Sequence, residues 1–297
     1  MFSKTRLVAF MAVLLVGLVA IVVTGCGGGG SSSSSETTAT EESAEGGGAA
    51  EEGGGEEEAG GGETLTVGSD IPYPPFEQGK KGSYTGFDVE LMEAIGKEIG
   101  REPEFIDSSF ETIFRDLAQE KFEAVMSAAT ITEEREKVVN FSLPYYLSEQ
   151  AILVKEGSSI TGLSDLKGKV VGAQQGTTGL ELGKEKAEAS ELRPFPEGPD
   201  ADNALKAGTV EAVIIDAPVA KQQAEELGGI EIVEKVPTEE TYGIAIAKAN
   251  TELLEQINEG LKEAIEDGSY TKVYEKWFKE APPLAGLEKA IEEAESK

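Results

Sequence analysis

Four polar residues stand directly after short apolar segments that are typical of buried strands: Asp70, Ser127, Gln174 and Asp216. A carboxylate in such a place can pair with a cation, and an amide or hydroxyl can donate or accept hydrogen bonds. Ligands of open α/β sheets bind at the carboxyl ends of the strands, so we expect these side chains to line a cleft. Two alternatives stay open: Asp216 could cap the following helix, and Asp70 could order the proline-rich turn after it.

Two further features could hold an anion. Thr177 and Thr178 follow Gly176 where a helical stretch begins, and free backbone N–H groups at a helix start attract negative charge. Helix capping by threonine is the alternative, and both roles can hold together. Arg135 stands among glutamates, and its guanidinium offers two parallel donors to a carboxylate. A solvated arginine at the start of a charged helix is the alternative.

Composition excludes several classes of chemistry. The chain has no His and a single Cys, Cys26. Nucleophilic catalysis by Ser-His-Asp or Cys-His, His-ligated metals, thiolate zinc clusters and an intrachain disulfide are therefore excluded. We expect no cofactor and no metal. The net charge of -30 argues against nucleic acid as a partner, because such binding needs a cationic face.

The N-terminal segment has the features of a secretory signal. Lys4 and Arg6 precede an apolar run over residues 7–23, and small residues lead to Cys26. The sequence Val-Thr-Gly-Cys at residues 23–26 resembles a bacterial lipobox, which implies that Cys26 carries the lipid after cleavage. An uncleaved membrane anchor is the alternative. In both cases the rest of the chain lies outside the cytoplasm.

Residues 27–62 consist of Gly, Ser, Thr, Ala and Glu. This composition has too little apolar area to offset the loss of chain entropy on folding. We therefore expect a disordered tether. From residue 63 onward, strand patterns such as 65–67 and 213–215 alternate with helical ones. Phe87, Leu91, Ile95 and Ile99 recur every fourth residue, as expected of an amphipathic helix. Repeated βα units predict an α/β fold with mostly parallel sheets and flanking helices.

Several ordered motifs resemble the polar amino-acid group of the family 3 solute-binding proteins. They are Gly-Ser-Asp-Ile-Pro-Tyr-Pro-Pro-Phe-Glu at 68–77, Gly-Phe-Asp-Val at 86–89, Met-Ser-Ala-Ala-Thr-Ile-Thr-Glu-Glu-Arg at 126–135 and Gly-Ala-Gln-Gln-Gly-Thr-Thr-Gly at 172–179. The resemblance runs from about residue 63 to 280. It implies a two-lobed periplasmic-binding-protein-like fold. The first lobe would combine residues 63–147 and 245–280, and the second would span 150–240, with two hinge crossings near Leu147 and Tyr242. Residues 281–297 form a charged tail that could pack on the first lobe or stay free.

The resemblance also implies a set of binding residues for a free amino acid. In it, Arg135, Thr177 and Thr178 face the ligand carboxylate, and Asp216 faces the ammonium. Tyr73 and Phe110 enclose the ligand side chain, and Asp70 contacts its far end. Core packing is the alternative for Phe110, because its spacing to Ile113, Phe114 and Leu117 predicts one face of a helix. The full set of eleven is Asp70, Tyr73, Phe110, Ser127, Ala128, Thr130, Arg135, Gln174, Thr177, Thr178 and Asp216.

The implied function is delivery of a polar amino acid to an ABC import permease by a monomeric binding protein. Gln174 stands where some glutamine-binding members of the family carry Lys, and a neutral side chain there favours arginine or another basic ligand, then glutamine. A different class remains open, because some proteins that share this fold are secreted dehydratases of prephenate-like acids. A dehydratase needs a positioned general acid, and the two cleft candidates, Asp70 and Asp216, already have binding roles. A sensing domain of a receptor or channel is a third class.

Overall fold

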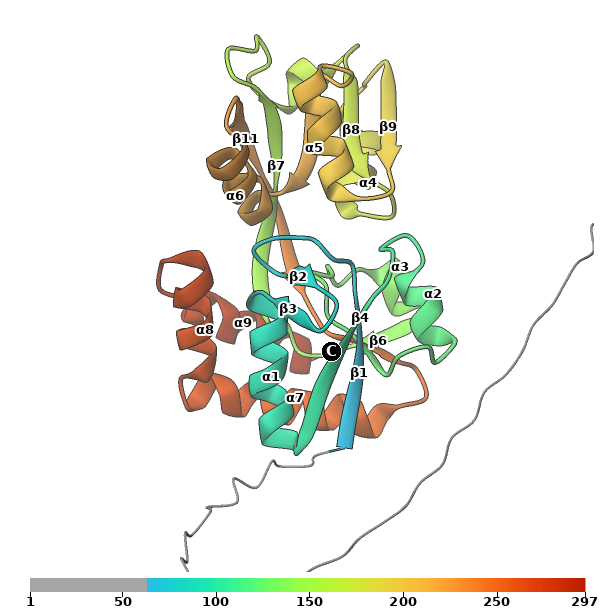
Figure 1. Ribbon diagram of the computed structural model, residues 1–297, viewed down its shortest axis with the longest axis vertical. Helices are drawn as coiled ribbons and strands as arrows, with labels where there is room; N and C mark the ends of the chain where they lie inside the picture. Colours follow the sequence, from blue (N-terminus) through green and yellow to red (C-terminus); the bar gives the residue numbers. More distant parts are fainter. Residues whose placement is uncertain (1–62, 297) are drawn as a thin grey trace, which may run out of the picture. The chain divides into compact units, whose positions relative to one another are not determined.

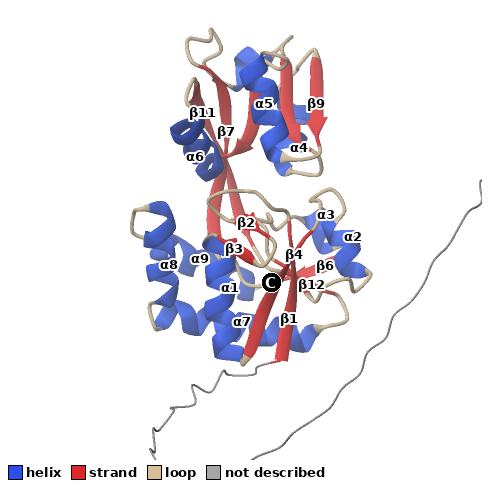
Figure 2. Ribbon diagram, in the orientation of Figure 1, coloured by secondary structure: helices blue, strands red, loops and turns tan. Residues whose placement is uncertain are grey.

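The computed structural model describes residues 63–296. The expectations for the signal segment, for the tether and for lipid on Cys26 lie outside the described residues. Within 63–296 the chain forms two five-stranded sheets, each flanked by helices, as Figure 2 shows. No helix in this range is long and apolar enough to span a bilayer.

The first sheet has the strand order β4-β1-β5-β12-β6. These strands are β1 (Glu63–Ser69), β4 (Arg101–Asp107), β5 (Ala124–Val125), β6 (Val139–Phe141) and β12 (Ala245–Ala247). β1 runs parallel to both β4 and β5, whereas β12 runs antiparallel to β5 and β6. The chain therefore returns from the second lobe to complete the first sheet, which brings residues near 245 beside residues near 124.

The helices of the first lobe are α1 (Phe87–Ile99), α2 (Ile113–Ala118), α3 (Glu133–Glu136), α7 (Thr251–Glu266) and α8 (Ser269–Phe278). A short hairpin, β2 (Gln78–Lys80) and β3 (Ser83–Thr85), precedes α1. The fourfold spacing of apolar residues in α1 buries Phe87, Leu91 and Ile95 completely. The helix ends at Gly100, which has the left-handed backbone (φ 73°) that glycine adopts without a steric penalty.

The second sheet has the order β11-β7-β10-β8-β9. Its strands are β7 (Tyr146–Lys155), β8 (Val170–Gln174), β9 (Glu191–Phe195), β10 (Ala212–Asp216) and β11 (Ile230–Tyr242). Its helices are η1 (Leu163–Leu166), α4 (Thr178–Lys186), α5 (Gly198–Ala207) and α6 (Ala217–Leu227). β8 runs parallel to β10 and β9, and β7 runs antiparallel to β10 and β11.

The two long strands β7 and β11 pair along most of their length and pass between the lobes (Figure 1). Leu147 pairs with Thr241, and Tyr146 with Tyr242, so both expected crossing points lie where these strands meet the first lobe. Because the chain crosses once in each direction, these strands are antiparallel, and each sheet is mixed. The α/β class is confirmed, with parallel pairing confined to one half of each sheet.

The charged C-terminal segment forms a helix, α9 (Leu284–Glu295), that packs against β7. Leu287 is buried in the main core, and Leu284 and Ile291 pack on the same cluster. An ideal methyl group built on Gly286 would lie 3.0 Å from the side chain of Leu147. The tail therefore covers the start of a crossing strand.

Candidate functional site

All eleven residues of the expected binding set line one cavity with about 300 Å³ of empty space. Asp70 follows β1, Ser127 follows β5, and Gln174 and Asp216 are the last residues of β8 and β10. The fold thus gathers the carboxyl ends of strands from both lobes, as the sequence predicts.

Arg135 is the only cationic residue among those that line the cavity. Its Nη1 donates to the backbone oxygen of Thr130 at 2.7 Å, and its Nη2 donates to that of Gly176 at 3.1 Å. The guanidinium carbon lies 5.1 Å from the ring centre of Phe110 and 4.8 Å from that of Phe114. These two rings and two carbonyls hold the group in place, and burial lowers the pKa of Arg135. Its remaining N–H groups can meet a carboxylate.

The start of α4 lies in the same cavity. Thr177 caps this helix, because its Oγ1 accepts from the N–H of Leu180 at 3.2 Å. The same hydroxyl donates to the backbone oxygen of Gln174 at 2.8 Å. Capping therefore accounts for the Thr177 side chain. The positive end of the helix and the N–H groups of its first turn still favour an anion here.

Asp216 precedes α6, but its side chain makes no capping hydrogen bond. It instead accepts from the hydroxyl of Tyr73 at 2.8 Å and from Nε2 of Gln150 at 2.5 Å. Burial, assisted by the charge of Glu240, raises the pKa of Asp216 to about 6. The capping alternative is thus wrong for this side chain. A buried carboxylate with a raised pKa is a strong partner for a cation that enters the cavity.

Asp70 and Gln174 meet across the cleft. Nε2 of Gln174 donates to Oδ2 of Asp70 at 2.5 Å and to the backbone oxygen of Pro196 at 3.2 Å. Burial and the nearby charge of Glu197 raise the pKa of Asp70 to about 8. Asp107, which accepts from the N–H of Ile71 at 3.3 Å, adds to this negative field. This end of the cavity therefore favours a ligand group that is positively charged or that donates hydrogen bonds.

Two rings line the cavity in different ways. Tyr73 lies within the main core and points its hydroxyl at Asp216. Phe110 packs with Ile113 and Leu117 and meets Phe114 edge to face at 5.8 Å. Phe110 packs in a core cluster and also lines the cavity, so core packing does not exclude a contact with the ligand. It lies in the turn before α2, since that helix begins at Ile113, and not within the helix as its spacing predicts.

The segment after β5 supplies three residues to the cavity. The Ser127 hydroxyl donates to Glu77 at 2.8 Å and accepts from the N–H of Asp70 at 2.9 Å. Ala128 adopts a left-handed backbone (φ 45°), which is rare for a residue other than glycine, and its N–H donates to Asp88 at 2.8 Å. The Thr130 hydroxyl donates to Glu240 at 2.8 Å. Buried carboxylates thus anchor all three residues.

Sequence reasoning missed four residues that support these contacts. Glu77 and Asp88 are completely buried, and Asp88 also accepts from the Tyr145 hydroxyl at 2.8 Å. Gln150 and Glu240 lie on β7 and β11, next to Asp216 and Thr130. Glu77 and Asp88 stand inside the recognised motifs, so those motifs did contain a signal for them. Gln150 and Glu240 carry no local signal, because their positions depend on the pairing of two distant strands.

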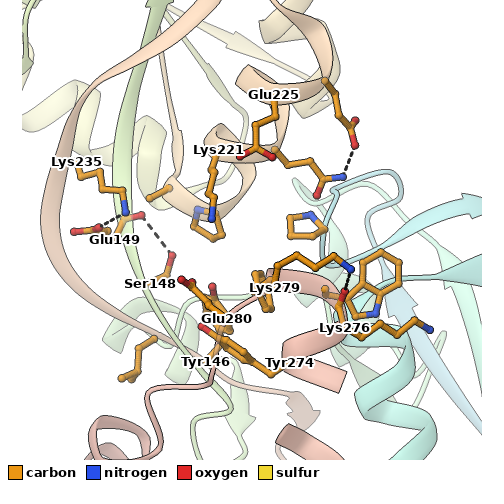
Figure 3. A pocket seen from close by; sticks show the side chains of 18 of the residues that line it. Tyr146, Ser148, Glu149, Lys221, Glu225, Lys235, Tyr274, Lys276, Lys279 and Glu280 are labelled. Atoms are coloured by element: carbon orange, nitrogen blue, oxygen red, sulfur yellow. Dashed lines mark hydrogen bonds and ion pairs between the residues drawn. The ribbon is translucent and has the colours of Figure 1, made fainter. Parts of the chain in front are cut away.

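A larger hollow lies beside the hinge (Figure 3) and contains none of the eleven residues. Both lobes contribute to it, with Tyr146 and Tyr274 below and Lys221 above. Its charges are mixed, and Lys235 pairs with Glu149 at 3.1 Å on the exposed surface. Because exposed pairs of this kind contribute little binding energy, the smaller cavity is the better candidate site. Among residues 63–296, no group of Cys, Asp or Glu side chains is arranged to hold a metal.

Comparisons with known proteins show the family to which the chain belongs. Residues 65–280 match the family model of the bacterial extracellular solute-binding proteins, family 3. The putative ABC transporter arginine-binding protein 2 of Escherichia coli is 33% identical over 73% of this chain and 91% of its own length.

Two solved structures share both fold and sequence. The arginine-, lysine-, histidine-binding protein ArtJ of Geobacillus stearothermophilus has a TM-score of 0.71 and 35% identity, covering 76% of this chain and all of the other. An ancestral arginine-binding protein bound to glutamine has a TM-score of 0.70 and 43% identity, and the match covers 73% of this chain and 98% of the other. These similar proteins are two-lobed binding proteins and not enzymes, so they give no support to the dehydratase alternative.

Proposed function

Because the chain belongs to family 3 of the bacterial extracellular solute-binding proteins, we propose that it binds a free polar amino acid in this cleft. The bound amino acid is delivered to an ABC import permease. One observation carries the proposal: Arg135 and Asp216, which have opposite charges and come from different lobes, line the same small cavity. A free amino acid carries both charges at once, and burial of each charge is costly unless it meets a partner.

The two charged ends of the ligand have separate partners. Arg135 and the start of α4 receive the carboxylate, since both present N–H donors to the cavity. Asp216 receives the ammonium. The hydroxyls of Ser127 and Thr130, together with the backbone carbonyl of Ala128, complete the polar wall. Each lobe holds part of the site, so a ligand gains all of its contacts only when the lobes meet. It therefore shifts the open–closed equilibrium toward the closed form, which the permease recognises.

The ligand side chain lies between Tyr73 and Phe110 and ends at Asp70. A basic side chain suits this end best, because the carboxyl groups of Asp70, Asp107 and Glu197 lie there, a bound cation favours the ionised form of Asp70, and the adjacent Gln174 brings no positive charge. Arginine is therefore the first expectation, and glutamine follows because its amide can also donate to Asp70. Aspartate and glutamate would be repelled. A bacterial relative named for arginine and an ancestral arginine-binding protein bound to glutamine support these two amino acids as candidates.

The direct test is a thermal-shift screen of the mature chain with the twenty amino acids, ornithine and citrulline. A ligand at a hundredfold excess over its Kd stabilises the folded state by about 2.7 kcal/mol. We expect L-arginine, L-lysine or L-glutamine to give the largest shift and L-aspartate and L-glutamate none. A screen without any response would refute amino-acid binding, and a strong response to glutamate would refute the role of Asp70.

We further propose that the protein is held at the outer face of the cell membrane by lipid on Cys26, with residues 27–62 as a tether. Two or more acyl chains hold a protein on a membrane stably, whereas one chain barely does. The substitution Cys26→Ala should move the protein from the membrane fraction to the soluble extracytoplasmic fraction. Retention of the variant in the membrane would instead indicate that residues 7–23 form an uncleaved anchor.

A further inference from the structure

Strand β11 has an irregularity at the hinge that turns one carboxylate inward. Val236 pairs with Gln150, and Glu240 pairs with Ser148, so four steps along β11 correspond to two along β7. Within the inserted stretch, Glu239 has a left-handed backbone (φ 51°). Such bulges bend a strand and redirect the side chains next to them, often beside a functional site. Here the result is that Glu240 is only 8% exposed, although it lies in a hinge strand.

The inward carboxylate accepts hydrogen bonds from three parts of the molecule. Thr130 Oγ1 of the first lobe donates at 2.8 Å, and Thr178 Oγ1 of the second lobe donates at 3.1 Å. Nε2 of Gln150, on the neighbouring strand, lies at 3.0 Å. All three donors are neutral, and within residues 63–296 Glu240 makes no ion pair. These hydrogen bonds, together with the more distant charge of Arg135, therefore stabilise the carboxylate.

The direction of these bonds determines what the two hydroxyls can offer to a ligand. A hydroxyl group has one proton and two lone pairs. Once Thr130 and Thr178 give their protons to Glu240, each can only accept from a group in the cavity. Nε2 of Gln150 also lies 3.3 Å from Thr178 Oγ1, but its two protons serve the closer Asp216 and Glu240, so Thr178 keeps acceptor capacity for a ligand. Two hydroxyls that only accept suit an ammonium group, so Thr178 can serve the ligand carboxylate only through its backbone N–H at the start of α4.

We propose that Glu240 is a positioning residue that fixes the hydroxyl protons of Thr130 and Thr178 and so makes the cleft selective for ligands with an α-ammonium group. The inference rests on the proposed amino-acid binding, and it adds a specificity determinant to that site. Asp216 supplies the charge that attracts the ammonium. Glu240 supplies the orientation of the neighbouring acceptors, and it needs no contact with the ligand.

The test compares L-arginine with 5-guanidinopentanoate, which has the same side chain and carboxylate but no α-ammonium. Both Kd values are measured by calorimetry, by competition where direct binding is weak, for the wild type and Glu240→Gln. Both hydroxyls donate to Oε2 of Glu240, whereas Gln150 donates to Oε1. A glutamine that places its NH2 group at the Oε2 position must donate to both hydroxyls, which frees their protons toward the cavity. The opposite orientation sets its NH2 group against that of Gln150, so either orientation disturbs the set of acceptors. We expect the preference of the wild type for L-arginine over the analogue to fall about tenfold in E240Q, as for one hydrogen bond to a charged group.

Control variants separate positioning from a general effect on the fold. Glu239→Gln removes a charge from the exposed neighbour on the same strand and should leave the preference unchanged. Thr130→Val should reduce it about as much as E240Q, and the double variant should lose much less than the product of the two single effects. The Thr130→Val result also tests the proposal if E240Q does not fold.

Three results have distinct meanings. A preference within twofold of the wild type in both E240Q and T130V would overturn the positioning role, even if both ligands bind more weakly. Full additivity in the double variant would overturn it as well. If the wild type binds no amino acid at all, the proposed function itself fails. That outcome is separate, because the wild-type titration alone reveals it.

Discussion

Replacement of Arg135 by alanine should nearly abolish amino-acid binding. The cavity has no other cationic residue, so the ligand carboxylate would face Asp70 and Asp216 without a charged partner. Removal of one member of a buried charge pair costs about 3–5 kcal/mol, which corresponds to a roughly 150- to 4000-fold increase in Kd. Arg135→Lys keeps the charge but loses the fork of parallel donors. It should cost about 1.5–3 kcal/mol, or roughly 10- to 150-fold.

The assay is isothermal titration of each variant with L-arginine, accompanied by thermal unfolding without ligand. Arg115→Ala is the matched control, because this arginine is 65% exposed and lies outside the cavity. R135A also loses hydrogen bonds to Thr130 and Gly176, so its unliganded melting temperature must be known before affinities are compared. A folded R135A that binds L-arginine within tenfold of the wild type would refute the assignment of the carboxylate to this side chain.

Three further predictions follow from the carboxylates. Asp70→Ala should weaken L-arginine binding more than L-glutamine binding in parallel titrations, because only arginine places a full charge at that end; equal losses would argue against this orientation. Burial raises the pKa of Asp70 to about 8, so it is mostly protonated at pH 7, and a bound guanidinium favours its ionised form. L-Arginine should therefore release close to one proton at pH 7 and L-glutamine fewer, as measured by calorimetry in buffers of different ionisation enthalpy; Asp70→Asn should remove the difference. Burial raises the pKa of Asp88 to about 7, so the folded state binds this proton more tightly than the unfolded chain does. The stability of the unliganded protein should then fall as the pH rises from about 4 to about 7, and urea unfolding of Asp88→Asn should show a flatter profile.

The elements that could be predicted from sequence are those with a local cause. The fourfold apolar spacing from Phe87 and the glycine at position 100 define α1, and both are visible without any partner. The strand ending in Asp216 is equally clear, since Val213, Ile214 and Ile215 precede it. Because strands of an α/β lobe end on a common edge, the sequence also predicts that Asp70, Gln174 and Asp216 lie close together.

Features set by distant pairing were not predictable in the same way. Glu240 resembles any other glutamate in a charged stretch until β11 pairs with β7 and the bulge turns it inward. Gln150 lies in an apolar strand, and only the three-dimensional fold brings it beside Asp216. The antiparallel halves of both sheets have the same origin, because they arise where the chain crosses between the lobes. Phe110 was placed in a helix because its spacing fits, yet the helix begins three residues later.

The central claim is that the two ends of a zwitterion are neutralised by Arg135 and Asp216. A crystal structure of the protein with L-arginine tests it most directly. We predict that the ligand carboxylate accepts two hydrogen bonds from the Arg135 guanidinium and that its α-ammonium lies within hydrogen-bond distance of Asp216. A ligand bound in the reverse direction, or in the hollow beside the hinge, would contradict the account.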